Sequence, residues 1–205
     1  MIQRFLQLPL VERFLSLSLV QRFLKLLLIL PALAGSYSHS NNLLVNPGFE
    51  SGSGQSIDGW KASAYINDSG HSAYSIDGDS HSGHNSLKIF SFQENDFMLT
   101  QDVPVEGGHA YKLSGWVKTE NVQSLQGKIG ANLCIARSFI RTASLKGTQP
   151  WTEVECYFRI TPNRTSVPIT CRLGFTNSVA TGGAWFDDIE LSEIQLPTDS
   201  NLPQY

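Results

Sequence analysis

The sequence predicts an all-β fold, either a sandwich or a barrel of short strands. Apolar and polar residues alternate over several segments, as they do in half-buried strands. Gly and Pro turn signals separate these segments, and no stretch shows the apolar period of an amphipathic helix. Apolar residues make up 41% of the 205 residues and charged residues 16%. This composition is typical of a globular domain with a real core. The series of short strands argues against an α/β enzyme.

Seven segments alternate most clearly between apolar and polar side chains. They are punctuated by Gly107-Gly108, Pro150, Pro162-Asn163 and Gly182-Gly183. The predicted strands cover Ser86–Phe92, Phe97–Val103, His109–Lys118, Lys128–Ile135, Thr152–Ile160, Val167–Phe175 and Ala184–Leu191. So many short strands in about 150 residues predict a single domain rather than two.

The N-terminal region is predicted to be a cleaved signal peptide over residues 1–34. Three similar nine-residue units begin at Ile2, Val11 and Val20, and a short apolar run then ends in Ala32-Leu33-Ala34. Basic residues, a short apolar region and a small-residue site are typical of secretory signals, so we expect a secreted, periplasmic or cell-surface protein. Translation from Val20 would also give a complete signal. An uncleaved membrane anchor is the alternative, but charged residues interrupt the segment.

Residues 35–40 are predicted to be a linker. Without residues 1–34 the chain keeps 11 Lys and Arg and 17 Asp and Glu, a net charge of −6. An acidic chain without a basic run is not expected to bind nucleic acid, or a membrane once the signal is cleaved. The charge suits a neutral or cationic ligand.

Three cysteines, Cys134, Cys156 and Cys171, have spacings that match no zinc motif. Alternation turns Cys156 and Cys171 toward the core. In an exported protein they form a disulfide or stay as two buried thiols, and the sequence leaves both open.

The strongest local signal is the segment from Ala184 to Leu191. Alternation places Trp185, Asp187, Ile189 and Leu191 on one face. Asp187 is then a carboxylate on an apolar face, which requires an Arg, several hydrogen bonds or a metal. Oxygen ligands of this kind suit Ca²⁺, but the spacing alone does not decide between calcium and a hydrogen-bonded Asp.

Several aromatic and polar residues are candidates for ligand binding. Within His109–Lys118, Trp116 alternates with the core residues and shares a face with Lys112, Ser114 and Lys118. An aromatic ring among polar groups suits a sugar, although Trp116 could instead pack under a loop. Asn132 and Arg172 are predicted on outward faces, where they could donate hydrogen bonds. The other tryptophans, Trp60, Trp151 and Trp185, are predicted to be core residues.

No sequence motif indicates catalysis. The chain has no Gly-x-Ser-x-Gly and no Cys/His signature, and no pair of carboxylates stands out as a glycosidase acid and nucleophile. His81 and His84 fit a polar turn better than a zinc site. Asn67 and Asn163 begin glycosylation sequons, which matter only in a eukaryotic secretory pathway.

Six short motifs occur in an order that resembles the CenC-type carbohydrate-binding modules, families 4, 9, 16 and 22. They are Asn42–Glu50, Asp58-Gly-Trp60, Ser82–Ile89, Tyr111–Lys118, Trp151–Val154 and Trp185–Leu191. The resemblance covers residues 41–193 and implies a jelly-roll β-sandwich of the galactose-binding-like type. Residues 194–205 then form a C-terminal tail.

The resemblance also implies one structural Ca²⁺ and a groove with stacking aromatics. The implied calcium ligands are the Gly48 carbonyl, Glu50, Ser82, the Asn85 carbonyl and Asp187. Position 82 can be acidic in similar modules, so Ser82 departs from the pattern. Phe97 and Phe139 lie close to where similar modules carry aromatic residues that stack on sugars.

The expected function is therefore non-catalytic carbohydrate binding by a free-standing secreted module. Its partners would be a glycan and, as a candidate, a separate glycan-active enzyme. Two alternatives stay open: an adhesion or protein-interaction module on the same sandwich, and a small glycan-active hydrolase. An intact aromatic groove favours glycan binding, and a groove filled by side chains favours protein interaction.

Overall fold

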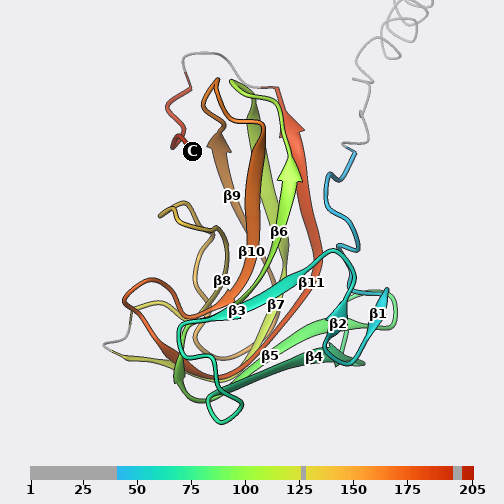
Figure 1. Cartoon of the computed structure of the whole chain (residues 1–205), viewed down its shortest axis with the longest axis vertical. Helices are drawn as coiled ribbons and strands as arrows, with labels where there is room; N and C mark the ends of the chain where they lie inside the picture. Colours follow the sequence, from blue (N-terminus) through green and yellow to red (C-terminus); the bar gives the residue numbers. More distant parts are fainter. Residues whose placement is uncertain (1–40, 126–127, 196–199) are drawn as a thin grey trace, which may run out of the picture. The chain divides into compact units, whose positions relative to one another are not determined.

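The computed structural model describes residues 41–125, 128–195 and 200–205. The predicted signal peptide and linker lie outside these residues. The described chain folds into strands that form two large antiparallel sheets and one small hairpin (Figure 1). Among the described residues, no helix has the length and apolar character needed to cross a membrane.

The strands are distributed over three sheets. The small hairpin pairs β1 (Gly52–Ser53) with β2 (Ser56–Ile57). The four-stranded sheet has the order β3 (Lys61–Ala64), β6 (Phe97–Pro104), β10 (Ser166–Leu173) and β8 (Ala131–Ile135). The five-stranded sheet has the order β4 (Ser72–Asp77), β5 (Ser86–Asn95), β11 (Ala180–Ile194), β7 (Ala110–Ser124) and β9 (Gly147–Arg159).

The core lies between the two large sheets and contains the alternate apolar side chains of each strand. Leu87 and Ile89 of β5 and Leu113 of β7 are completely buried on the inner face of the five-stranded sheet. Leu99 of β6 and Ile169 of β10 meet them from the four-stranded sheet. Two sheets that bury one face each against the other form a β-sandwich, which confirms the predicted fold class.

All seven predicted strands are present, with bounds that differ by a few residues. The strands β3 and β4, which lie between the hairpin and β5, were not predicted. The segment Lys61–Ala64 is short and mostly exposed, and Ser72–Asp77 is an edge strand in which three of the six residues are polar and five are only partly buried. Period-two alternation is weak when the strand buries little apolar surface.

A β-bulge in β11 overturns the predicted face of Trp185 and Asp187. The pairing of β11 with β7 shifts register between Asp187 and Glu190, and Asp188 has a φ of 48°. The bulge reverses the alternation, as an extra residue in one strand must. Ile189 and Leu191 therefore point into the core, while Trp185 and Asp187 lie on the outer face.

Trp185 is nevertheless buried, with 4% of its surface exposed, because two lysine side chains cover its ring. The Nζ atoms of Lys88 and Lys118 lie 4.6 Å and 5.4 Å from the ring centroid. Of the other predicted core tryptophans, Trp60 is in the core and Trp151 is half-buried.

The three cysteines are free thiols, so the structure decides between the two possibilities in favour of unpaired Cys156 and Cys171. Burial raises the pKa of Cys134 to about 11 and that of Cys156 to about 12. Burial also raises the pKa of Cys171 well above its usual value. These thiols are protonated at neutral pH and are therefore poor nucleophiles.

The end of the predicted tail returns to the sandwich. Tyr205 pairs with β9 through its backbone: its N–H donates to Arg159, and its carbonyl accepts from Thr161 at 2.8 Å. The guanidinium of Arg164 lies 4.1 Å from the centroid of the Tyr205 ring. These contacts fix residues 203–205 against the edge of the five-stranded sheet.

We expect Gly115→Ala to destabilise the domain because the two sheets approach closely there. A Cβ at Gly115 would lie 2.6 Å from Cδ1 of Ile189 and 2.9 Å from Cδ1 of Leu133. Overpacking of this kind costs about 1–3 kcal/mol. The control is Gly78→Ala, where a Cβ meets nothing within 4 Å. Urea unfolding of both variants checks this, and equal midpoints would contradict the close packing of the sheets at Gly115.

Candidate functional site

A cavity of about 520 Å³ opens at one end of the sandwich, next to the outer face of the four-stranded sheet. Its volume lies within the range of ordinary ligand pockets. Its walls come from the ends of β3, β6 and β7 and from the turn between β10 and β11. The lining residues are Ala64, Tyr65, Asp96, Met98, Leu125, Phe175, Thr176, Asn177 and Val179.

The pocket and its rim carry aromatic rings that solvent can reach. Tyr65 is 77% exposed and Phe139, on the segment after β8, is 85% exposed. The Phe139 ring lies 6.3 Å from that of Phe175, which lines the pocket. Large aromatic side chains are usually buried in a soluble protein, so two such exposed rings at one pocket indicate a binding surface.

A buried ion pair forms the floor beside these rings. Nε of Arg172 donates to Asp96 at 2.6 Å, and Nη2 of Arg172 donates to the second carboxylate oxygen. The two side chains are 5% and 9% exposed. Burial alone would lower the pKa of Arg172, but Asp96 raises it above its usual value. The guanidinium also lies 4.6 Å from the Phe175 ring centroid, so the pair fixes both Asp96 and Phe175.

Asn132 and Arg172 lie on the outer face of their sheet, as predicted, but other residues of the domain bury both side chains. Both lie on the outer face of the four-stranded sheet, where they are paired directly, but Asn132 is 0% and Arg172 is 4% exposed. Arg172 is engaged by Asp96, and Nδ2 of Asn132 donates to the carbonyls of Gly130 and Gly174. Neither side chain is free to bind a ligand directly.

Of the two phenylalanines implied by the family resemblance, Phe97 is buried and Phe139 is exposed. Phe97 begins β6 with its side chain turned inward, is 7% exposed, and packs on Tyr74 with ring centroids 5.4 Å apart. It therefore has no free ring face for stacking, contrary to expectation. Phe139 is exposed beside the pocket and remains a candidate for ligand binding.

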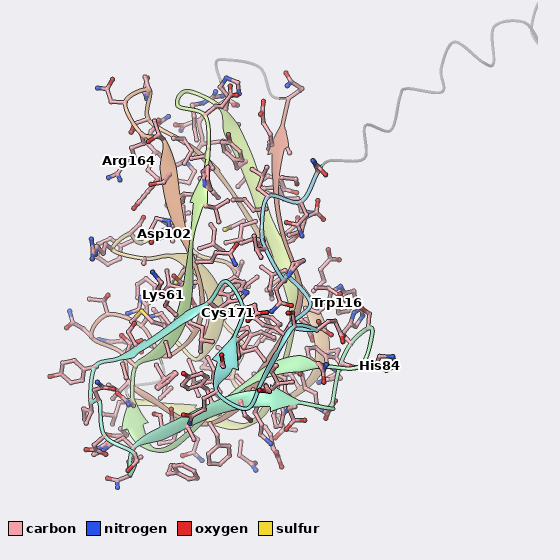
Figure 2. The ribbon with its side chains drawn as sticks, turned by 45° about the vertical axis from the view of Figure 1, so that its right-hand side comes forward. Lys61, His84, Asp102, Trp116, Arg164 and Cys171 are labelled. Carbon is pink, nitrogen blue, oxygen red and sulfur yellow. The ribbon has the colours of Figure 1, made fainter. Side chains whose placement is uncertain are left out.

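Trp116 lies on the outer face of β7, as predicted, but away from the pocket. The His81 ring stacks on its indole at 3.8 Å and 11°. The alternative role, packing under a loop, matches this contact. Figure 2 shows Trp116 and His84 toward one side of the sandwich, with Lys61 and Asp102 of the four-stranded sheet's outer face toward the other.

The implied calcium ligands meet where the N-terminal motif, the loop before β5 and the β11 bulge come together. Asp187 is fully buried. Its Oδ2 accepts from the backbone N–H groups of His81 and Ser82, at 2.8 Å and 3.0 Å, and its Oδ1 accepts from Asp188. Burial raises the pKa of Asp187 even though these N–H groups act to lower it.

Asp188, which the sequence reasoning did not single out, joins this cluster through the bulge. Its two carboxylate oxygens bind the Ser82 hydroxyl and Nδ1 of His81, each at 2.7 Å. Gly48 lies against both aspartates, because a Cβ there would be 3.5 Å from Oδ1 of Asp187 and 3.8 Å from Oδ1 of Asp188. A side chain at position 48 would fill this space.

Glu50 holds the other end of the same loop. Its Oε1 accepts from the backbone N–H groups of His84 and Asn85, at 2.7 Å and 3.0 Å, and these bonds lower its pKa. The structure thus brings Gly48, Glu50, Ser82, Asn85 and Asp187 into one region.

The donor set fits Ca²⁺ in kind, since carboxylate, hydroxyl and carbonyl oxygens are the ligands that this ion takes. In the described part of the chain, however, no group of three His, Cys, Asp or Glu side chains is arranged to hold a metal. Calcium here would therefore need backbone carbonyls, such as those of Gly48 and Asn85, to complete its coordination.

The sequence reasoning missed Tyr65, Asp96 and Phe175 at the pocket. Tyr65 follows a strand that gave no alternation signal, and Phe175 was assigned to the end of a predicted strand. Asp96 could have been noticed as a carboxylate between two strands, but its partner lies 76 residues away.

The comparisons with known proteins give the same fold. The sequence profile of a family described as "carbohydrate binding domain" matches residues 41–178. The chain belongs to this family. No curated protein sequence matches the chain.

Solved structures with this fold include proteins of different kinds. The TmCBM61 module, solved in complex with β-1,4-galactotriose, is 21% identical with a TM-score of 0.51. The match covers 76% of this chain and 100% of that module. A cyclase from Fischerella sp. TAU is 14% identical with a TM-score of 0.53, covering 75% and 96%.

The enzymatically active domain of tailspike protein 4 from bacteriophage CBA120 has a TM-score of 0.54 at 14% identity. That match covers 75% of this chain, which spans about a fifth (21%) of the tailspike chain. At these identities the likeness shows the fold alone, so the function must be argued from the site of this carbohydrate-binding domain.

We expect Asp96→Asn to destabilise the domain by about 3–5 kcal/mol, because it leaves the Arg172 guanidinium buried without its counter-charge. Replacing both partners, as in Asp96→Leu with Arg172→Met, should recover part of this loss. Asp102→Asn, which replaces an exposed Asp on β6, the strand that follows Asp96, is the matched control. Urea unfolding measures all three, and a single variant as stable as the control would show that the pair contributes little.

Proposed function

We propose that this domain binds a neutral glycan, without catalysis, in the pocket between Tyr65 and Phe175. The observation that supports this most is the pair of exposed rings, Tyr65 and Phe139, beside a pocket with polar groups. The apolar C–H face of a sugar stacks on an aromatic ring while its hydroxyls need hydrogen bonds. Asp96, Thr176 and Asn177 line the same pocket and offer such partners.

The charge of the pocket favours a neutral ligand. Arg172 neutralises Asp96 and is itself almost completely buried, and no Lys or Arg is among the residues that line the pocket. A carboxylate that is already paired can still accept a hydrogen bond from a sugar hydroxyl at its remaining lone pairs.

The residues that line the pocket also support a non-catalytic role. Among the residues that line the pocket, Asp96 is the one carboxylate, and glycosidases of the usual kind need two. Neither a retaining nor an inverting mechanism would thus find its second carboxyl group at this pocket. The buried thiols are protonated and are not candidates for a nucleophile.

A second candidate function, protein interaction or adhesion, is favoured by the filled outer face of the four-stranded sheet. Asn132, Cys134 and Thr170 are fully buried there, so the middle of this face offers no open groove. Export through residues 1–34 and a separate glycan-active enzyme as partner remain predictions. Export would place the domain outside the cell, where polysaccharides are found.

We also propose a structural Ca²⁺ at the cluster of Gly48, Glu50, Ser82, Asn85 and Asp187. The oxygen ligands and the loop enclosed by Glu50 and Asp187 support it. When bound, the ion would supply positive charge that offsets the buried carboxylate. The alternative is that the backbone N–H groups satisfy Asp187 without any metal.

Tyr65→Ala should weaken glycan binding by about 1–3 kcal/mol, which is the loss measured for other ligand-stacking aromatic rings and equals roughly a 5- to 150-fold change in Kd. Phe139→Ala should have a similar effect. A glycan array with the described domain identifies the ligand, with β-1,4-galactan, xylan and cellulose oligosaccharides among its probes, and calorimetry measures each variant.

Two variants serve as controls for that experiment. Tyr157→Ala removes a 39%-exposed ring on β9, outside the pocket, and should leave affinity unchanged. Trp116→Ala tests the competing position that the sequence favoured. Loss of binding in Trp116→Ala with none in Tyr65→Ala would move the site to the five-stranded sheet. Release of reducing sugar by the purified protein would overturn the non-catalytic role.

Removal of calcium should lower the melting temperature. An ion that binds only the folded state stabilises it by about 2.7 kcal/mol at a concentration 100 times its Kd. EDTA should remove this stabilisation from the wild type, and Asp187→Asn should abolish the response to EDTA. Asp102→Asn should respond like the wild type. If the wild-type melt is unchanged by EDTA and elemental analysis finds no metal, Asp187 is held by hydrogen bonds alone.

A further inference from the structure

A second hollow lies on the outer face of the five-stranded sheet, away from the pocket described above. It has a volume of about 340 Å³ and is formed by β4 and β5 at the edge of the sheet. Ala73, Tyr74, Ser75, Asp77, Lys88, Phe90 and Phe92 line it. The function proposed above uses the other pocket and does not account for this hollow.

The hollow contains a pair of phenylalanine rings on the outer face of β5, whose inner face is buried in the sandwich. Phe90 and Phe92 alternate with Ile89 and Ser91, which are buried inside. The two rings lie 4.9 Å apart at 55°, and Phe92 is 60% exposed. The pair therefore forms a partly exposed apolar surface that does not belong to the hydrophobic core.

A glycine on the neighbouring strand positions the first ring. A Cβ at Gly183 of β11 would lie 3.2 Å from Cδ2 of Phe90 and 3.1 Å from Cζ3 of Trp185. Without that Cβ, both rings lie close against the backbone of β11. Phe90 thus packs against the backbone at Gly183, and the Phe92 ring beside it is mostly exposed to solvent.

Charged groups next to the rings are already paired. Lys88 forms an ion pair with Asp77 at 3.2 Å, and Lys118 pairs with Asp79. Both lysines cover Trp185, which fixes their stems along the sheet. The rim of the hollow thus offers hydrogen-bonding groups, namely Ser75, Asp77 and Lys88, with balanced charge.

We propose that Phe90 and Phe92 form a second sugar-contact face, which takes a neutral glycan by stacking on Phe92 with hydrogen bonds to Ser75, Asp77 and Lys88. This proposal rests on glycan binding as the proposed function, but uses a different face. Met98, on the outer face of the four-stranded sheet, lines the pocket, whereas Phe90 lies on the outer face of the five-stranded sheet with the Phe92 ring beside it. One domain therefore contacts two glycan chains and links them.

The size of this surface favours a sugar over a protein. Seven residues line the hollow, whereas a stable protein interface takes about 20–30 residues from each partner. Sugar binding needs one ring face and a few polar groups, which is what this hollow provides. Two weak sites on different faces also raise retention on a polysaccharide through multivalency.

The test is affinity electrophoresis in gels that contain β-1,4-galactan, xylan or hydroxyethylcellulose. Four proteins are compared with the wild type: Phe92→Ala, Tyr65→Ala, the double variant, and Tyr157→Ala as an exposed aromatic control on the same outer face. In the gel that retards the wild type most, Phe92→Ala should lower the apparent affinity about five-fold or more. Tyr65→Ala should keep partial retardation, which the double variant should lose.

Turbidity of the same soluble polysaccharide gives a second readout. The wild type should cross-link chains and raise light scattering, and each single variant should abolish this while the Tyr157→Ala control does not. Size-exclusion chromatography checks that the wild type is a monomer, because cross-linking by a dimer would not need a second face. A dimer whose scattering survives Phe92→Ala would overturn the proposal.

The outcomes separate the two sites. If Phe92→Ala behaves as the wild type in both backgrounds while Tyr65→Ala loses binding, the second face is wrong and the pocket stands. If Phe92→Ala loses binding and Tyr65→Ala does not, the pocket is wrong and the second face stands. Melting curves show whether each variant is folded, and Phe92, being mostly exposed, should be replaced at little cost.

Discussion

The buried ion pair between Asp96 and Arg172 is the interaction on which the candidate site depends. Asp96 lies where the chain leaves β5 of one sheet and enters β6 of the other, and Arg172 lies on β10, which pairs with β6. Removing two charges from water is costly, and the pair is retained only with good geometry and further contacts. Here the guanidinium also lies against Phe175, so one contact fixes the corner between the sheets and a wall of the pocket.

The cluster around Asp187 fastens the opposite part of the sandwich in a related way. Asp187 and Glu50 bind backbone N–H groups at the two ends of the loop before β5, and Asp188 binds two of its side chains. The loop makes no ladder with a neighbouring strand along residues 79–85, so these carboxylates satisfy its donors. Because the bulge turns Asp187 outward, β11 presents two successive carboxylates, Asp187 and Asp188, to this loop.

Alternation of apolar residues was enough to predict the sandwich, because the core strands bury one face and expose the other. It correctly placed Trp116 outside, in alternation with core residues that the structure shows to be Leu113 and Val117. It failed at Asp187, since a one-residue bulge reverses the faces and leaves no mark in composition. It placed Arg172 and Asn132 correctly on the outer face, but it could not show that distant residues bury them there. In a regular strand, side-chain direction follows from alternation in the local sequence, whereas bulges and burial on an outer face depend on contacts with residues that are distant in the chain.

The filled outer face explains why the candidate pocket lies at the end of the sandwich. With Arg172, Asn132 and Thr170 buried, the centre of the four-stranded sheet has no room for a ligand. The open space lies instead where Tyr65, Leu125 and the turn at Thr176 and Asn177 meet. These are connecting segments held by a rigid sheet, the usual place for variable binding residues. In the proposed pocket, ligand choice would therefore be set by these turns, and the ion pair beneath them holds the turns in place.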